Sequence, residues 1–217
     1  GKTVADTPAI RDPHRFVREH TALMPPPLVP EMPLHLAVET VALWQETEEA
    51  LGEMGLPPPF WAFAWAGGQA LSRYLLENPD VVAGKRVLDF GAGSGMVAIA
   101  AALAGADHVL ASDIDPVAEA AMQLNRSEND VEFDITTEDL VGSSGDWDIL
   151  LVGDVCYDKE IADMVMPWIR AQAHSGKTVL IGDPGRFYLP RMGLKRIAAY
   201  HAPTTSIMED SDLRNAQ

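Results

Sequence analysis

The feature that most constrains this chain is a strand that runs directly into a glycine turn and then into a helix. Residues 87–90 form an apolar run that contains one acidic residue, glycines follow at positions 91, 93 and 95, and residues 96–103 are apolar over a helical length. A turn without side chains lets a ligand approach the backbone, and the start of a helix presents free N–H groups. The pattern therefore predicts that a cofactor binds against this turn.

The spacing of the glycines distinguishes two kinds of cofactor site. A dinucleotide-binding fingerprint has the form G-x-G-x-x-G, and its third glycine would fall at position 96, which is Met96. The chain instead has G-x-G-x-G after a hydrophobic start that includes Asp89. This spacing resembles motif I of the class I S-adenosylmethionine (AdoMet) methyltransferases.

Composition narrows the choice of partners. The 217 residues include 16 basic and 32 acidic side chains, which give a formal net charge of −16. Such a surface repels phosphate backbones, so we expect no nucleic-acid partner. The acidity either favours a basic protein partner that presents lysines or serves only to keep the protein soluble. No apolar run approaches the ~18 residues of a membrane span, and we expect no membrane partner. The six histidines lack metal-ligand spacing and Cys156 is the single cysteine, so no metal site is predicted.

The rest of the chain alternates strand and helix patterns, which is typical of a doubly wound α/β fold with a mostly parallel, Rossmann-like sheet and helices on both faces. The predicted strands are 85–90, 108–113, 131–135, 148–153, 177–182 and 194–201, and the predicted core helices are 67–77, 94–104, 116–125 and 159–173.

The N-terminal part is expected to be a helical extension. Asp12 and Pro13 can start a short helix, and Pro33 suits the first position of a long helix that ends near Met54. Three prolines at 57–59 form a stiff connection into the next segment. We therefore divide the chain into an N-terminal extension, 1–58, and a catalytic domain, 59–217.

The C-terminal end is harder to assign. Sheets of this class usually close with an antiparallel hairpin, yet only 194–201 is a clear strand, and the polar residues 206–217 are expected to make a poor one. Either the last strand lies beyond residue 217, or another element covers that edge of the sheet.

An acidic residue follows the second predicted strand. Asp113 lies 18 positions after Gly95, where a carboxylate of a doubly wound fold can accept hydrogen bonds from both ribose hydroxyls of a cofactor. Ile114 would offer an apolar face to an adenine ring. Asp115 and Pro116 instead suit the N-cap and first turn of the following helix.

A second acidic residue, Asp154, follows Gly153 at the end of the fourth strand, and Tyr157 can face the same pocket. This pair suits amine methylation, because a lysine with a pKa near 10.4 is neutral in only about one part in a thousand at physiological pH, a cost of ~4 kcal/mol. A carboxylate can orient the amine while apolar walls lower its pKa. The alternative is that Asp154 caps helix 159–173, although Asp158 lies nearer its start.

Two further segments flank the predicted sheet. Trp65 could cover a cofactor and Gln69 could hydrogen-bond its polar end, whereas the aromatic residues Phe60, Trp61 and Phe63 are assigned to core packing. Residues 182–186 follow the fifth strand. They form either a simple tight turn or a functional loop, in which the arginine at 186 binds a substrate carboxylate or stabilises the loop.

Taken together, these segments resemble the lysine methyltransferases of the electron-transfer flavoprotein β subunit, which carry an Asp/Glu-x-x-Tyr/Phe motif after the fourth of seven strands. The resemblance covers roughly residues 28–200 and rests on Pro59–Ala62, Trp65, Gly67–Leu76, Asp89–Gly95, Asp113–Pro116, Gly153–Tyr157 and Ile181–Arg186. It implies a class I methyltransferase domain over 59–217 that uses AdoMet, with S-adenosylhomocysteine as product. The implied acceptor is a protein lysine, on the flavoprotein β subunit.

The resemblance also assigns site residues. Trp65, Gly91, Gly93, Gly95, Asp113, Thr137 and Gly153 match the cofactor pocket of the family, and the residue patterns add Gln69, Asp89, Ala92 and Ile114. Asp154 and Tyr157 match the motif that holds the target lysine. The tryptophan-proline of the family reads Trp65-Ala66 here, a departure that concerns the lid over the pocket.

Other interpretations stay open at this point. The enzyme could methylate another protein, such as a ribosomal protein, or a small amine, and a deep closed pocket would favour the latter. The chain could also be a non-catalytic AdoMet-binding scaffold. Since no Arg/Ser-rich presequence or secretory signal opens the sequence, we expect a bacterial cytoplasmic protein, or a mitochondrial matrix form whose presequence was removed. A monomer is expected.

Overall fold

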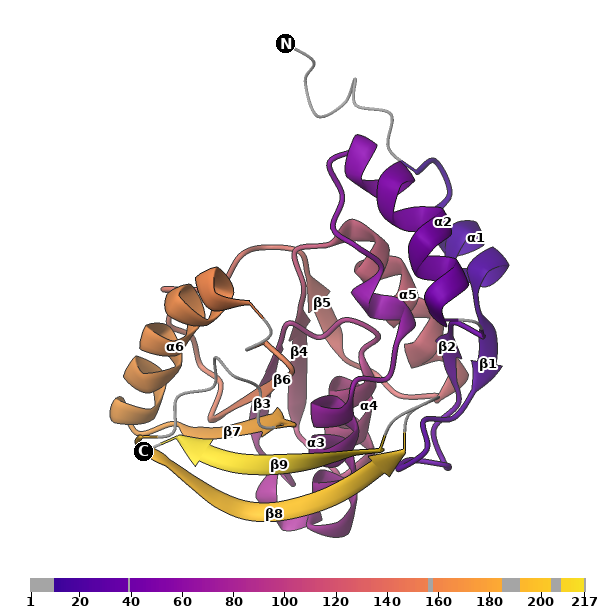
Figure 1. Ribbon diagram of the computed structural model, residues 1–217. Helices are drawn as coiled ribbons and strands as arrows, with labels where there is room; N and C mark the ends of the chain where they lie inside the picture. The colour runs from indigo at the N-terminus through magenta and orange to yellow at the C-terminus, as the bar shows by residue number, and fades with distance from the viewer. Residues whose placement is uncertain (1–9, 39, 156–157, 185–191, 204–207, 217) are drawn as a thin grey trace.

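The computed structural model describes residues 10–38, 40–155, 158–184, 192–203 and 208–216 (Figure 1). Its helices are α1 Pro13–His20, α2 Thr40–Glu53, α3 Ala66–Glu77, α4 Met96–Leu103, α5 Pro116–Glu128 and α6 Lys159–His174, with short 3-10 turns η2 Phe60–Ala62 and η3 Pro79–Val81. Its strands are β1 Ala22–Met24, β2 Leu34–Leu36, β3 Arg86–Phe90, β4 His108–Ser112, β5 Asp134–Thr136, β6 Ile149–Gly153, β7 Thr178–Asp183, β8 Leu194–Pro203 and β9 Met208–Ala216.

A seven-stranded sheet with the order β5-β4-β3-β6-β7-β9-β8 forms the centre of the molecule. The five strands from β5 to β7 pair in parallel, while β9 runs antiparallel to both β7 and β8. Alternate residues along the strands pack into two separate buried clusters. Val87, Ile149 and Leu180 pack with α3, α4 and α5 on one face, and Leu88, Leu150 and Val179 pack with α6 on the other. The predicted doubly wound α/β fold is thereby confirmed.

The C-terminal strand corrects one prediction. Residues 208–216 form β9, which lies between β7 and β8, with Asp183 opposite Asp212 and Leu194 opposite Ala216. The expectation that the polar tail makes a poor strand is wrong. Strand propensity depends on context, and a segment with a neighbouring strand on each side can hydrogen-bond along both of its edges. The composition of the tail does not reveal this position.

The N-terminal part corrects a second prediction. Leu34–Leu36 is a buried strand that pairs antiparallel with β1, with Leu23 opposite His35, and α2 begins only at Thr40. The expected start of the long helix at Pro33 is therefore wrong, whereas its expected end near Met54 is confirmed by α2. The backbone N–H of Ala37 donates to the carbonyl of Ala62, a distant contact that local periodicity does not show.

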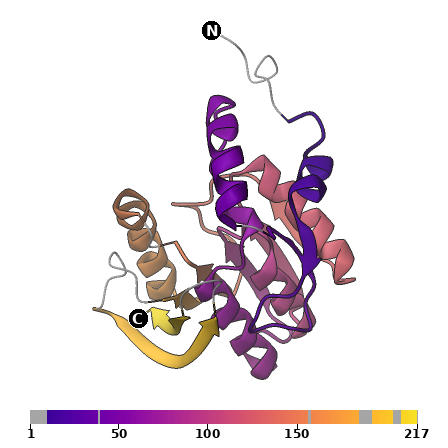
Figure 2. The same cartoon turned by 45° about the vertical axis from the view of Figure 1, so that its right-hand side comes forward.

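The first predicted helix is confirmed as α1, which Asp12 caps by accepting a hydrogen bond from the N–H of Arg15. Helix α1 and strand β2 lie along α5 (Figure 2). Val17, Met32 and Leu34 belong to the same buried cluster as α4 and α5. The division of the chain at residue 58 stays a prediction. In the described part of the chain, no helix has the length and apolar character needed to cross a membrane.

Candidate active site

A cavity of about 420 Å³ opens at the carboxyl edge of the sheet, where β3, β4 and β6 end. This edge is where open α/β sheets bind their ligands, and the volume is in the range of small-molecule sites. The lining of the cavity includes residues 89–94, 112–115, 138–139 and 153–155, the aromatic side chains of Phe60, Trp61, Phe63 and Trp65, and Ile161, Met164 and Val165 of α6.

The glycine turn forms one wall of this cavity. Gly91, Gly93 and Gly95 have φ angles of +66°, +54° and +84°, in the left-handed region that glycine occupies at little cost. Gly91, Ala92 and Gly93 line the cavity, whereas Gly95 does not. A Cβ at Gly95 would lie 3.0 Å from the Cγ atom of Met122, so this glycine lets the turn pack closely on α5.

Asp113 connects the end of β4 to the glycine turn. Its Oδ2 atom accepts a hydrogen bond of 2.8 Å from the N–H of Gly93, and its Oδ1 atom accepts one of 3.0 Å from the N–H of Asp115. Burial raises the pKa of the Asp113 carboxyl above its ordinary value. A carboxylate has about four acceptor positions, and these two bonds use half of them. Asp113 can therefore accept ribose hydroxyls while it holds the turn.

The two residues after Asp113 have different positions. Ile114 is 62% exposed and lies in the wall of the cavity. The Oδ1 atom of Asp115 accepts a 2.8 Å hydrogen bond from the N–H of Val117, which confirms the predicted N-cap of α5.

Asp89 lies beneath the turn and is 2% exposed. Its Oδ2 atom accepts a 2.9 Å hydrogen bond from the N–H of Ala98 and so ties the end of β3 to the start of α4. Burial raises the pKa of Asp89 to about 8, and the nearby carboxyl of Asp113 contributes to this rise. Asp89 therefore serves chiefly to fix the helix that follows the turn.

Asp154 lies in the same cavity and also caps a helix, though not the one considered from the sequence. Its two carboxylate oxygens accept hydrogen bonds from the N–H groups of Gly67, at 3.1 Å, and Gly68, at 2.7 Å, in the first turn of α3. Its own N–H donates to the carbonyl of Gly182, and its φ angle is +50°. The alternative role as a cap of α6 is wrong, because Asp158 occupies that position.

The geometry gives the Asp154 carboxylate a fixed direction. Left-handed backbone is uncommon for a residue other than glycine and costs energy, so it persists only where the surroundings impose it. Here β7 and the N-terminus of α3 impose it together. The N–H groups and the positive end of the α3 dipole also stabilise the negative charge. Tyr157, Cys156 and Arg186 lie outside the described residues.

Besides Gly95, two predicted cofactor contacts, Gln69 and Thr137, do not line the cavity. Gln69 is 3% exposed, accepts a hydrogen bond from the N–H of Leu28 and donates one to the carbonyl of Ala64. Its amide thus holds two backbone segments together, and it does not line the cavity. Thr137 is exposed and also lies outside the lining, whereas its neighbours Glu138 and Asp139 are part of it.

The aromatic segment contributes more than the sequence suggested. Trp61 and Phe63 pack in the core cluster, as predicted, and Phe60, Trp61 and Phe63 also line the cavity beside Trp65. The indole N–H of Trp65 donates to the carbonyl of Phe60, and the rings of Phe63 and Trp65 lie 5.4 Å apart. The density of aromatic residues over 60–65 was the available signal, but it does not distinguish a cavity wall from a core.

Comparison with known proteins gives matches along most of the chain. The family model described as ribosomal protein L11 methyltransferase (PrmA) matches residues 69–171. The electron transfer flavoprotein beta subunit lysine methyltransferase of Xenopus laevis is 46% identical over 80% of this chain and 71% of its own length. The protein of the same description from Danio rerio is 40% identical over 96% of this chain and 82% of its own length.

Solved structures support the fold. The ribosomal protein L11 methylase from Lactobacillus delbrueckii subsp. bulgaricus has a TM-score of 0.55 at 22% identity, covering 75% of this chain and 83% of its own. The magnesium protoporphyrin IX methyltransferase from Synechocystis PCC 6803 was solved with bound AdoMet. It has a TM-score of 0.52 at 20% identity, and the match covers 69% of this chain and 78% of its own. These likenesses establish a methyltransferase fold.

The relatives also correct the expected source and location. Relatives that match over most of the chain include proteins of Xenopus laevis, Danio rerio and Homo sapiens, all of them animals. This finding contradicts the expectation of a bacterial cytoplasmic protein. That expectation rested on the residues at the start of the sequence, which carry no such information.

Proposed function

This chain belongs to the family of electron transfer flavoprotein beta subunit lysine methyltransferases, and we propose that the beta subunit of that flavoprotein is its substrate. It is an AdoMet-dependent protein lysine methyltransferase. The observation that carries the proposal is that one cavity contains both the glycine turn with Asp113 and the carboxylate of Asp154.

The residues of the cavity fit AdoMet. The left-handed turn at 91–93 brings backbone close to the ligand, Asp113 supplies acceptors for ribose hydroxyls, and Ile114 supplies an apolar surface for adenine. The proposed cofactor contacts are Trp65, Asp89, Gly91, Ala92, Gly93, Asp113, Ile114 and Gly153, with Gly95 acting through the shape of the turn. When bound, AdoMet supplies an electrophilic methyl group on a sulfonium sulfur.

The chain's own residues prepare the lysine. The Asp154 carboxylate, fixed by Gly67 and Gly68, attracts the lysine ammonium and orients its nitrogen. The apolar walls formed by Trp65, Val155 and Met164 exclude water, which favours the neutral amine over the charged one. Once the ammonium has given its proton to water, the lone pair of the amine would be free to accept the methyl group that AdoMet supplies, with S-adenosylhomocysteine as the leaving group. Tyr157 is proposed to complete the motif.

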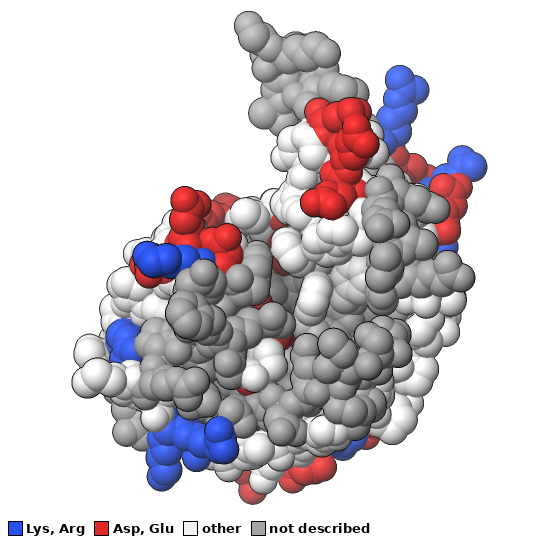
Figure 3. Space-filling view, viewed as in Figure 1, with Lys and Arg blue, Asp and Glu red and all other residues white. Residues whose placement is uncertain are grey.

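The acidic charge of this chain also supports a protein partner that presents lysines. The chain carries a net charge of −16, and acidic side chains gather over α2 and α6 on the face seen in Figure 3. Exposed acidic residues there include Glu48, Glu49, Glu160 and Asp163. Opposite charge speeds association and orients the partner on approach.

Incubation with radiolabelled AdoMet tests the proposal directly. Purified flavoprotein beta subunit from the same organism is expected to acquire label on lysine, located by mass spectrometry after proteolysis. A lysate incubated in parallel is expected to show a labelled band of the same size. Label on other proteins with none on the beta subunit would contradict the proposed partner. Label on small molecules alone would identify a metabolite methyltransferase, and AdoMet binding without any transfer would identify a scaffold.

The cofactor assignment of Asp113 has its own test. Asp113→Ala is expected to weaken AdoMet binding by about 1–3 kcal/mol, roughly 5- to 150-fold in Kd, because a charged acceptor is lost and the N–H of Gly93 loses its partner. Calorimetry on the purified variant measures the change. Asp107→Ala is the matched control, since Asp107 is exposed and lies at the opposite end of β4. An unchanged Kd in Asp113→Ala would remove Asp113 from the pocket.

A further inference from the structure

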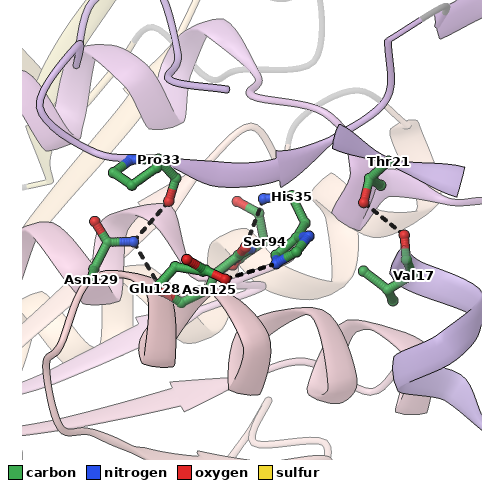
Figure 4. A network of polar contacts seen from close by, with 8 residues as sticks. All are labelled: Val17, Thr21, Pro33, His35, Ser94, Asn125, Glu128 and Asn129. Carbon is green, nitrogen blue, oxygen red and sulfur yellow. Dashed lines mark hydrogen bonds and ion pairs between the residues drawn. The ribbon is translucent and has the colours of Figure 1, made fainter. Parts of the chain in front are cut away.

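Asn125 of α5 is fully buried, and its side chain joins two segments that are far apart in the sequence (Figure 4). Its Oδ1 atom accepts a 2.8 Å hydrogen bond from the backbone N–H of His35 in β2. Its Nδ2 atom donates a 2.8 Å hydrogen bond to the carbonyl of Ser94 in the glycine turn. One amide thus connects the N-terminal hairpin, formed by β1 and β2, to the wall of the cavity.

The carbonyl of Ser94 needs such a donor. Ser94 precedes Gly95, the N-cap of α4, so its carbonyl lies outside the helix, and the N–H of Ala98 is one of the N–H groups of the first turn that have no partner within the helix. Here that N–H donates to the Oδ2 atom of Asp89 instead. Ser94 is only 4% exposed, and a buried carbonyl without a donor is costly. The amide of Asn125 supplies the donor that the carbonyl of Ser94 lacks within its own segment.

The turn is therefore held from two sides at adjacent residues. Asp113, which follows β4, accepts from the N–H of Gly93, while Asn125 donates to the carbonyl of Ser94. Both Gly93 and Ser94 line the cavity, whereas Asn125 does not. Any effect of Asn125 on a ligand must act through the position of the turn.

We propose that Asn125 is a positioning residue for the cofactor site, which fixes the glycine turn through the carbonyl of Ser94. The inference rests on the proposed use of AdoMet. It extends the site to a residue that does not line the cavity. Because the N–H of His35 donates to Asn125, strand β2 also helps to hold the turn. The N-terminal hairpin then serves the cofactor site.

The competing interpretation is that Asn125 is a buried amide that only stabilises the fold. Asn129, one turn later on α5, provides the comparison. Its Nδ2 atom donates to the carbonyls of Pro33, at 2.8 Å, and Asn125, at 2.9 Å, and neither carbonyl lies in the glycine turn. Both asparagines join α5 to the N-terminal segment, but only Asn125 reaches Ser94.

The test makes the same change at both positions. Asn125→Asp keeps the shape and the acceptor for His35 but replaces the amide donor, so the carbonyl of Ser94 loses its partner. We expect the Kd of AdoMet and of S-adenosylhomocysteine, and the KM for AdoMet, to rise at least about tenfold, with kcat and the KM for the protein substrate within twofold. Asn129→Asp is expected to lower the melting temperature while AdoMet affinity stays within twofold of the wild type.

Three outcomes would overturn or limit the inference. Wild-type affinity for AdoMet in a folded Asn125→Asp protein would overturn the inference. It would also be overturned if Asn125→Asp and Asn129→Asp lost equal AdoMet affinity together with equal stability. If Asn125→Asp does not fold, Asn125→Ser is measured in its place, with the same expected rise and the same overturning result. Failure of the wild-type protein itself to bind AdoMet would instead overturn the proposed function on which the inference rests.

Discussion

Replacing Asp154 with alanine is expected to abolish methyl transfer, with a loss of at least about a hundredfold in kcat/KM, or about 2.7 kcal/mol. The variant removes the carboxylate proposed to orient the lysine nitrogen in the cavity. It also removes the acceptor for the N–H groups of Gly67 and Gly68, so we expect a loss of about 1–2 kcal/mol in the free energy of unfolding. Transfer of label to the beta subunit and chemical unfolding measure the two effects.

Two further variants separate the chemical role of Asp154 from its role as a cap. Asp154→Asn keeps the shape of the side chain and one oxygen acceptor, but it removes the charge and leaves one of the two N–H groups of α3 without an acceptor, so stability should fall by less than in Asp154→Ala while transfer is lost. Asp158→Ala removes the cap of α6, where the N–H of Ile161 is the donor, and Asp158 does not line the cavity. That control should lower stability and leave transfer unchanged.

The results that contradict this assignment are distinct. Full activity in Asp154→Asn would show that the negative charge is not used in the reaction. A parallel loss of AdoMet affinity and transfer in Asp154→Ala would assign Asp154 to the cofactor site or to the fold. Near wild-type AdoMet affinity with no transfer is the expected pattern.

Local patterns were sufficient for the centre of the fold. The turn after β3 and the cap at Asp115 each depend on residues within a few positions of one another, where spacing and side-chain chemistry determine the structure. The carboxyl edge could also be predicted, because parallel strands place Asp113 and Asp154 at the same end of the sheet. These are the parts of the site that the sequence predicted.

The missed features depend on contacts between distant segments. Asp154 accepts a hydrogen bond from the N–H of Gly67, 87 residues earlier, and Gln69 joins a segment 41 residues away. Strand β9 is stabilised by its place between β7 and β8 although its composition is polar. In each case the residue type has a common local explanation, so periodicity and spacing alone favour the wrong interpretation.

The second large effect is expected at Gly67, where α3 crosses β7 with no space for a side chain. A Cβ at Gly67 would lie 2.6 Å from the carbonyl carbon of Gly182 and 2.7 Å from the Oδ2 atom of Asp154. The first of these atoms belongs to the backbone of a buried strand and cannot move aside without displacing the sheet. Gly67→Ala is therefore expected to destabilise the protein by about 3 kcal/mol, at the upper end of the usual range for overpacking.

Gly52→Ala is the matched control, because Gly52 lies in α2 and no atom would come within 4 Å of the added Cβ. Helix propensity alone favours alanine over glycine by about 0.5–1 kcal/mol, so the control should be neutral or stabilising. Urea unfolding of both variants measures the difference. If Gly67→Ala is as stable as Gly52→Ala, the close approach of α3 to β7 is wrong. If Gly67→Ala is destabilised as expected, methyl transfer should also fall. The added Cβ would displace the carboxylate of Asp154 from the N–H groups of α3 that orient it.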